Sequence, residues 1–119
     1  MARAFAEVMA LPLQVTFRDV RHSDSLEARV RARADKLESF HRQITSCRVA
    51  LEAPHRQKRH GLRYRVRIDL TVPGAKLVIG RHEFSDAYAA VDDAFHDAQR
   101  VLTQHASRHR EVRGDAAPR

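Results

Sequence analysis

The sequence predicts an α+β two-layer sandwich with the element order β-α-β-β-β-α, in which a four-stranded sheet carries both helices on one face. Apolar and polar residues alternate in four segments, which is the pattern of half-buried strands. In two other segments apolar residues recur every three or four positions, which is typical of amphipathic helices. The first strand joins the second through a helix, and the right-handedness of such crossovers places both helices on one side. The opposite sheet face is therefore expected to be open to solvent.

The four predicted strands span residues 13–18, 44–53, 62–72 and 76–83. The third has the clearest pattern, because apolar residues occupy every second position from Leu62 to Val72 and arginines fill the positions between them at its start. The last three strands follow one another through short connections, so they are expected to form an antiparallel meander. Gly80 is expected to mark a bulge in the fourth strand.

The first helix is predicted to begin at a cap on Ser23 or Asp24 and to run to about Phe40. The second is predicted to begin at Ser85 or Asp86 and to run to about His109. Their buried stripes are Leu26, Val30, Ala34 and Leu37 in the first helix, and Tyr88, Val91, Phe95, Ala98 and Leu102 in the second. The folded domain should therefore span residues 13–110, with residues 1–12 as a flexible leader and residues 111–119 as a disordered tail.

The composition of the 119 residues indicates an anionic partner. Lys and Arg number 22 against 15 Asp and Glu, which gives a net charge of +7. Nearly all of these cations are arginines, whose guanidinium groups suit phosphate. This excess of positive charge predicts that the binding partner is a nucleic acid or, as the second choice, an anionic membrane surface. The membrane is the weaker reading, since neither helix combines a basic face with bulky interfacial aromatics.

The sequence does not indicate catalysis. The single cysteine, Cys47, excludes an intramolecular disulfide framework, favours a reduced cytoplasmic location, and lies on the apolar side of a strand. Asp92 and Asp93 are consecutive in a helix, so their side chains should diverge. His105 and His109 stand one turn apart, as two metal ligands could, but no spacing implies a third ligand. We expect no enzyme, no cofactor, no metal and no small-molecule substrate; a metal- or His-dependent enzyme is the alternative, which elemental analysis would decide.

Basic residues form the candidate binding site. Arg29, Arg33 and Lys36 recur at steps of four and three, which predicts a basic stripe on the first helix. The alternative is a solvated helix held by pairs such as Arg31–Asp35. The predicted RNA-binding residues are Arg29, Arg33, Lys36, Arg56, Lys58, Arg59, Arg100, Arg108 and Arg110.

The aromatic residues indicate how RNA would be recognised. Phe17, Tyr64, Tyr88 and Phe95 fall on apolar stripes and are expected in the core, so no stacking platform for bases is evident. Recognition is therefore expected to read phosphates and the shape of folded RNA. A general RNA chaperone or duplex-RNA binder shares this strand and helix order and stays open as an alternative.

Specific segments resemble the ribosome hibernation-promoting factors and ribosome-associated inhibitors, a sigma-54 modulation protein-like family. The most specific is Asp86–Asp92 (DAYAAVD), followed by Leu102–His105 (LTQH), in the last helix. The first helix, through Lys36–Glu38, and the segment Arg67–Gly74 are similar to the corresponding parts of the family. The likeness covers about residues 13–110, and the family's β-α-β-β-β-α fold agrees with the order predicted above.

The resemblance implies a function that charge alone does not. Members bind the small ribosomal subunit and its rRNA near the decoding sites, and block mRNA and tRNA binding in stationary phase or stress. By position, Arg33 and Lys36 match basic places on the first helix, and Arg100 and Arg108 match them on the last. Asp97, Gln104 and Ala106 stand where members often carry Lys or Arg. No dimerisation domain is evident after Arg110, so the chain resembles the short form.

Overall fold

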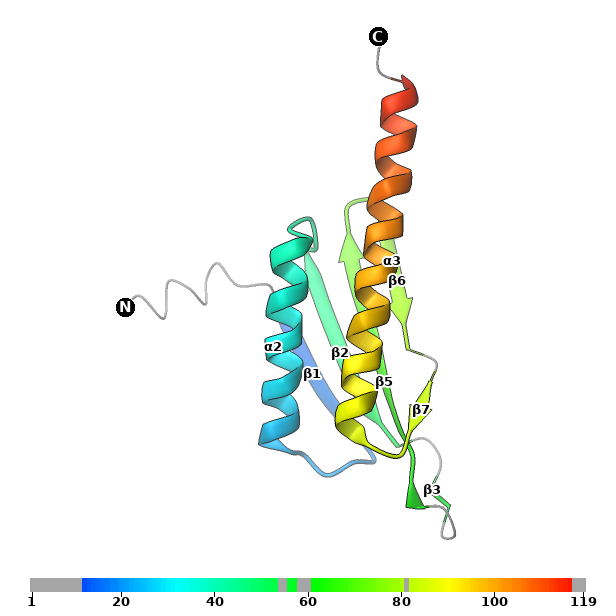
Figure 1. Cartoon of the computed structure of the whole chain (residues 1–119). Helices are drawn as coiled ribbons and strands as arrows, with labels where there is room; N and C mark the ends of the chain where they lie inside the picture. The colour runs from blue at the N-terminus through cyan, green and yellow to red at the C-terminus, as the bar shows by residue number, and fades with distance from the viewer. Residues whose placement is uncertain (1–11, 54–55, 58–60, 81, 117–119) are drawn as a thin grey trace, which may run out of the picture.

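The structure, a computed structural model, describes residues 12–53, 56–57, 61–80 and 82–116. Both helices cover one face of the main sheet, which confirms the predicted two-layer α+β architecture (Figure 1). The elements in chain order are β1 (Leu13–Arg18), α2 (Asp24–Phe40), β2 (Ser46–Glu52), β3 (Arg56–Gln57), β4 (Gly61–Leu62), β5 (Tyr64–Val72), β6 (Ala75–Ile79), β7 (Glu83–Phe84) and α3 (Ala87–Ala116).

The main sheet has the order β1-β2-β5-β6, with β7 also paired to β5. As the helical crossover predicts, β1 is parallel to β2, whereas β5 is antiparallel to β2, β6 and β7. The register places Val15 beside Val49 and Val49 beside Ile68. Because side chains alternate between faces, these residues form one apolar layer beneath the helices.

Gly80 marks a bulge, as predicted, and divides the expected fourth strand into β6 and β7. Ile79 of β6 pairs with Ile68 and Glu83 of β7 pairs with Arg65, so the register with β5 shifts by one residue between the two strands. The φ angle of Gly80 is +118°, and a Cβ atom there would overlap the carbonyl oxygen of Val66. Only glycine meets both conditions without strain.

Both helices begin at the predicted caps. The Ser23 hydroxyl accepts a hydrogen bond from the Leu26 backbone N–H at 3.2 Å, and an Asp86 carboxylate oxygen accepts one from the Tyr88 N–H at 3.2 Å. The predicted stripes are buried in the core, except that Tyr88 is only partly buried. Its hydroxyl lies 2.6 Å from that of Ser25, which links the first turns of the two helices.

One connection holds an element that was not predicted, and the tail differs from its prediction. Between β2 and β5, the strands β3 and β4 form a short antiparallel ladder. The helix α3 continues past His109 to Ala116, so residues 111–116 are helical and not a disordered tail. Extending an existing helix needs no new nucleus, and Gly114 weakens a helix without ending it. The rest of the predicted leader and tail, residues 1–11 and 117–119, lies outside the described residues.

Candidate nucleic-acid interface

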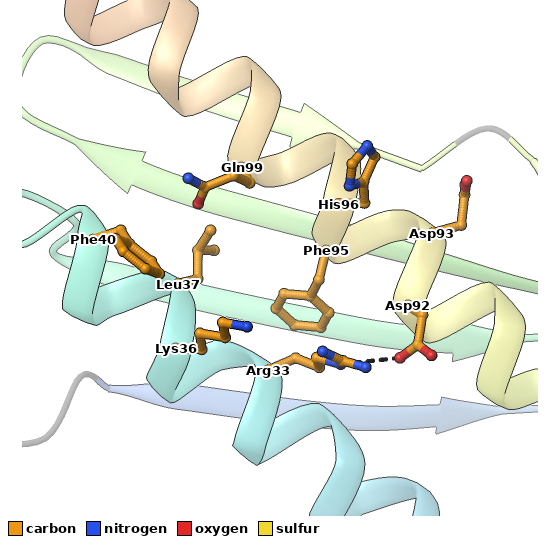
Figure 2. A pocket seen from close by; sticks show the side chains of 9 residues that line it. All are labelled: Arg33, Lys36, Leu37, Phe40, Asp92, Asp93, Phe95, His96 and Gln99. Atoms are coloured by element: carbon orange, nitrogen blue, oxygen red, sulfur yellow. Dashed lines mark hydrogen bonds and ion pairs between the residues drawn. The ribbon is translucent and has the colours of Figure 1, made fainter.

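A groove of about 690 Å³ lies between α2 and α3 (Figure 2). We call it the helix groove; it is lined by Arg33, Lys36, Leu37, Phe40, Asp92, Asp93, Phe95, His96 and Gln99. The side chains of Leu37 and Phe95 are buried and form its floor. The groove therefore joins an apolar floor to charged rims, and two predicted RNA-binding residues, Arg33 and Lys36, line it.

Asp92 pairs with two of the three cations of the predicted basic stripe. Its carboxylate accepts hydrogen bonds from Arg29 Nη1 at 3.0 Å and from Arg33 Nε at 3.0 Å, which ties α2 to α3. The Arg29 guanidinium also lies 5.2 Å from the centre of the Tyr88 ring, within cation–π range. Arg29 and Arg33 therefore hold the two helices together, and Arg33 also lines the groove. Asp93 pairs with His82 and not with the arginines of α2, which confirms that the two aspartate side chains diverge.

The exposed cations without an ion pair to any described residue include Lys36 and Arg42 near the end of α2 and Arg108 on α3. The two helices run in the same direction, so all three lie toward one end of the helix layer (Figure 1). Without a carboxylate partner, their charge is available to phosphate. Arg42 was not among the predicted site residues, because it lies in the turn after the helix and outside the periodic stripe.

The remaining predicted site residues are spread over other elements. Arg100 pairs with Asp97 at 3.5 Å. Arg56 lies in β3 and Arg110 in α3, whereas Lys58 and Arg59 lie outside the described residues.

Arg31 donates to Glu27, at 3.0 Å, and not to the predicted partner Asp35. A hydrogen bond from His22 and a second from Arg31 lower the pKa of the Glu27 carboxyl below its ordinary value of 4.5. The Arg31–Glu27 pair nevertheless confirms that an ion pair within the helix occupies part of the exposed surface of α2.

On the open face of the sheet, three arginines pair with carboxylates of the same face. Arg18 and Arg65 both donate to Glu52, at 3.5 and 3.1 Å, and Arg67 donates to Asp69 at 3.0 Å. These pairs leave the open face less available to an anionic partner than its arginine content suggests. Two exposed cations on this face, Arg48 and Lys76, form no ion pair with a described residue.

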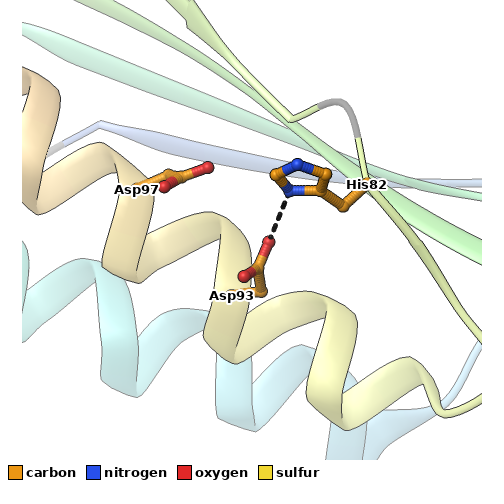
Figure 3. A group of neighbouring side chains, drawn as sticks. All are labelled: His82, Asp93 and Asp97. Atoms are coloured by element: carbon orange, nitrogen blue, oxygen red, sulfur yellow. Dashed lines mark hydrogen bonds and ion pairs between the residues drawn. The ribbon is translucent and has the colours of Figure 1, made fainter.

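A third cluster joins α3 to the segment before β7. His82 Nδ1 lies 3.2 Å from an Asp93 oxygen, and Asp97 follows one helical turn later (Figure 3). Possible ligand atoms of all three residues lie within 4.8 Å of one another, a spacing a cation could bridge. Each carboxylate already has a protein partner, His82 or Arg100. The predicted pair His105–His109 stays a prediction, because the His109 side chain lies outside the described part of the chain.

Cys47 is buried, as predicted for a small apolar residue. Desolvation, with the negative charge of Asp69 as a smaller cause, raises the pKa of its thiol to about 12. The thiol is therefore almost entirely protonated at neutral pH and a poor nucleophile.

One family model and two solved structures match this chain. The family model described as sigma 54 modulation protein / S30EA ribosomal protein matches residues 13–110. A ribosomal subunit interface protein from Coxiella burnetii superposes with a TM-score of 0.69 at 16% identity, covering 82% of this chain and 99% of that one. The Protein Y N-terminal domain of Thermus thermophilus superposes with a TM-score of 0.64 at 18% identity, covering 81% and 99%.

A comparison with curated sequences finds no significant match. No helix in the described ranges is long and apolar enough to cross a membrane. The two structural likenesses establish the fold, and the family model matches nearly all of the described residues. The chain belongs to the sigma 54 modulation protein / S30EA ribosomal protein family.

Proposed function

We propose that this chain inactivates ribosomes by binding the small subunit near its decoding sites, where it blocks mRNA and tRNA under stress or in stationary phase. The observation that carries the proposal is the family match over residues 13–110. Two solved structures, one of them a ribosomal subunit interface protein, share the fold. A ribosome partner in turn supports a cytoplasmic location.

Electrostatic attraction to rRNA is the proposed source of affinity. The chain carries a net charge of +7. Each phosphate that a cation neutralises releases counterions, so binding should weaken steeply as salt rises. Lys36 and Arg108 are suited to this role because neither is held by a carboxylate among the described residues. Contacts to phosphate position a protein on RNA without reading its sequence.

Occupancy, and not catalysis, is the proposed activity. The thiol of Cys47 is buried and its pKa is raised to about 12, so it does not supply a nucleophile at neutral pH. A chain that blocks a channel by filling it needs only affinity, shape and enough stability to stay folded on the subunit.

A charge-reversal pair tests which face binds. We expect Lys36→Glu with Arg108→Glu to weaken binding to purified small subunits strongly, while leaving it measurable at low salt. Losing two phosphate contacts should also reduce the slope of log affinity against log salt by roughly 1.4 to 1.8. Both side chains are exposed, so the fold should survive, which circular dichroism would check.

Arg48→Glu with Lys76→Glu is the matched control, because it changes the net charge equally on the open sheet face. We expect this variant to bind nearly as the wild type does, apart from a modest long-range loss. If the control variant lost binding and the helix variant kept it, the helix layer would be the wrong face. If the wild type itself failed to bind in dilute buffer, the proposed function would be wrong.

Competition separates this proposal from a general structured-RNA binder. An excess of free duplex RNA should displace a general binder from ribosomes but should hardly affect a factor that recognises the subunit. If duplex RNA displaced all of the protein from ribosomes, even at an amount equal to that of the protein, the protein would be a general RNA binder.

A further inference from the structure

The helix groove carries an exposed aromatic ring at its rim. Phe40 is 64% exposed, whereas Leu37 and Phe95, which line the same groove, are 4% and 5% exposed (Figure 2). The described residues include one other large hydrophobic side chain with comparable exposure, Val78, which is on the opposite face of the molecule. Phe40 thus continues the apolar floor of the groove out to solvent.

The helix geometry explains why this ring lies outside the core. The buried stripe of α2 passes Leu37, and its next position, four residues later, is His41. His41 is 7% exposed and its Nε2 lies 3.1 Å from Oε1 of Gln99 on α3. Phe40 precedes that position, so the helix turns its side chain away from the core. The ring is therefore held by a regular helix and is available to a partner.

Two cations lie close to Phe40 in the sequence. Lys36 lies one helical turn before Phe40, and Arg42 follows it by two residues. Neither forms an ion pair with a described residue, and both are exposed. Side chains one turn apart on a helix are about 5–6 Å apart at their Cβ atoms, a distance that one nucleotide can span. A ring beside a free cation matches the two parts of a nucleotide, its flat base and its phosphate.

We propose that Phe40 stacks on one unpaired base of the bound RNA while Lys36 contacts the adjoining phosphate. This inference rests on the proposed function and adds a stacking site to an interface that the sequence predicted to read only phosphates and shape. A single ring suffices for a base, because every base has a flat π-face. An apolar protein partner would need a broader hydrophobic patch than one side chain with its buried neighbours.

The test measures the affinity of purified small subunits for Phe40 variants over a series of salt concentrations. We expect Phe40→Ala to weaken binding roughly 5- to 140-fold, since stacking on one base accounts for that range. The slope of log affinity against log salt should stay unchanged, because stacking releases no counterions. Chemical probing of the rRNA should show one unpaired nucleotide that the wild type protects and Phe40→Ala leaves reactive.

Three further variants distinguish stacking from other contacts. Phe40→Tyr should bind as the wild type does, whereas Phe40→Leu, which keeps apolar bulk but lacks the ring, should lose affinity as the alanine variant does. Val78→Ala, at the equally exposed hydrophobic position, should bind normally. Full binding by Phe40→Leu would indicate an apolar protein contact and overturn the proposal.

The two proposals fail in different ways. Salt-sensitive binding of the wild type together with unchanged binding of Phe40→Ala would refute the stacking site and leave the proposed function intact. A wild-type protein that does not bind small subunits would refute the proposed function and the stacking site together. The two substituted side chains, Phe40 and Val78, are exposed, so thermal unfolding should confirm that each of the four variants folds.

Discussion

Removing the Asp92 carboxylate should make the protein less stable and its RNA binding stronger. In Asp92→Asn, the ion pairs to Arg29 and Arg33, each 3.0 Å long, are lost. The three side chains are between 37% and 40% exposed, so solvent screens both pairs. Pairs of this exposure contribute about 0.2–1 kcal/mol each, which predicts a loss of roughly 1 kcal/mol. For a domain of this size the melting temperature should fall by about 3–6 °C.

The same substitution frees two arginines for phosphate. We expect the affinity for small subunits at low salt to rise, and the slope of log affinity against log salt to steepen by up to roughly 1.4–1.8 if both arginines find a phosphate. Calorimetry would measure the stability, and binding titrations across a salt series would measure the affinity. Opposite changes in the two quantities are the signature of one carboxylate that competes with RNA for the same cations.

Asp35→Asn is the control for net charge. Asp35 is exposed on the same helix and forms no ion pair with a described residue, so its loss changes the charge without releasing an arginine. An equal gain in affinity for Asp35→Asn would mean that net charge alone sets the binding. Weaker binding by a well-folded Asp92→Asn would mean that Asp92 orients the arginines toward RNA, and the competition argument would be wrong.

Three other predictions concern the fold and two titrating groups. Gly80→Ala should destabilise the protein clearly more than Gly74→Ala in denaturant unfolding, because both residues have a positive φ but only the first meets backbone at the new Cβ. Cys47 should resist thiol reagents at pH 8 until the chain unfolds, since its pKa is about 12. The Glu27 carboxyl should titrate below 4.5 in NMR, and His22→Ala should raise that midpoint. Because its pKa is lowered by folding, its contribution to stability is full above 4.5 and is lost as the pH falls through the folded value.

The periodic segments could be predicted because local spacing decides which face of an element is apolar. The stripe from Leu26 to Leu37 and the alternation along β5 place the core correctly. The bulge at Gly80 was also predictable, because only glycine tolerates a positive φ beside a neighbouring backbone. The exposure of Phe40 could also have been predicted from the sequence. The buried stripe of the first helix continues from Leu37 to His41, four residues later, and does not include Phe40.

The ion pairs of the site depend on contacts between residues that are far apart in the chain, which periodicity does not predict. The sequence alone determined the fold class, the basic character and the inert position of Cys47, because these depend on composition and on periods of two or three to four residues. The contacts of Asp92 with Arg29 and Arg33, and of His82 with Asp93 and Asp97, form only in the folded chain and could not be predicted from the sequence. These partners are far apart in the chain, so their contact depends on how α3 packs beside α2 and the sheet. Charge can be counted along a chain, but which charges remain free depends on packing.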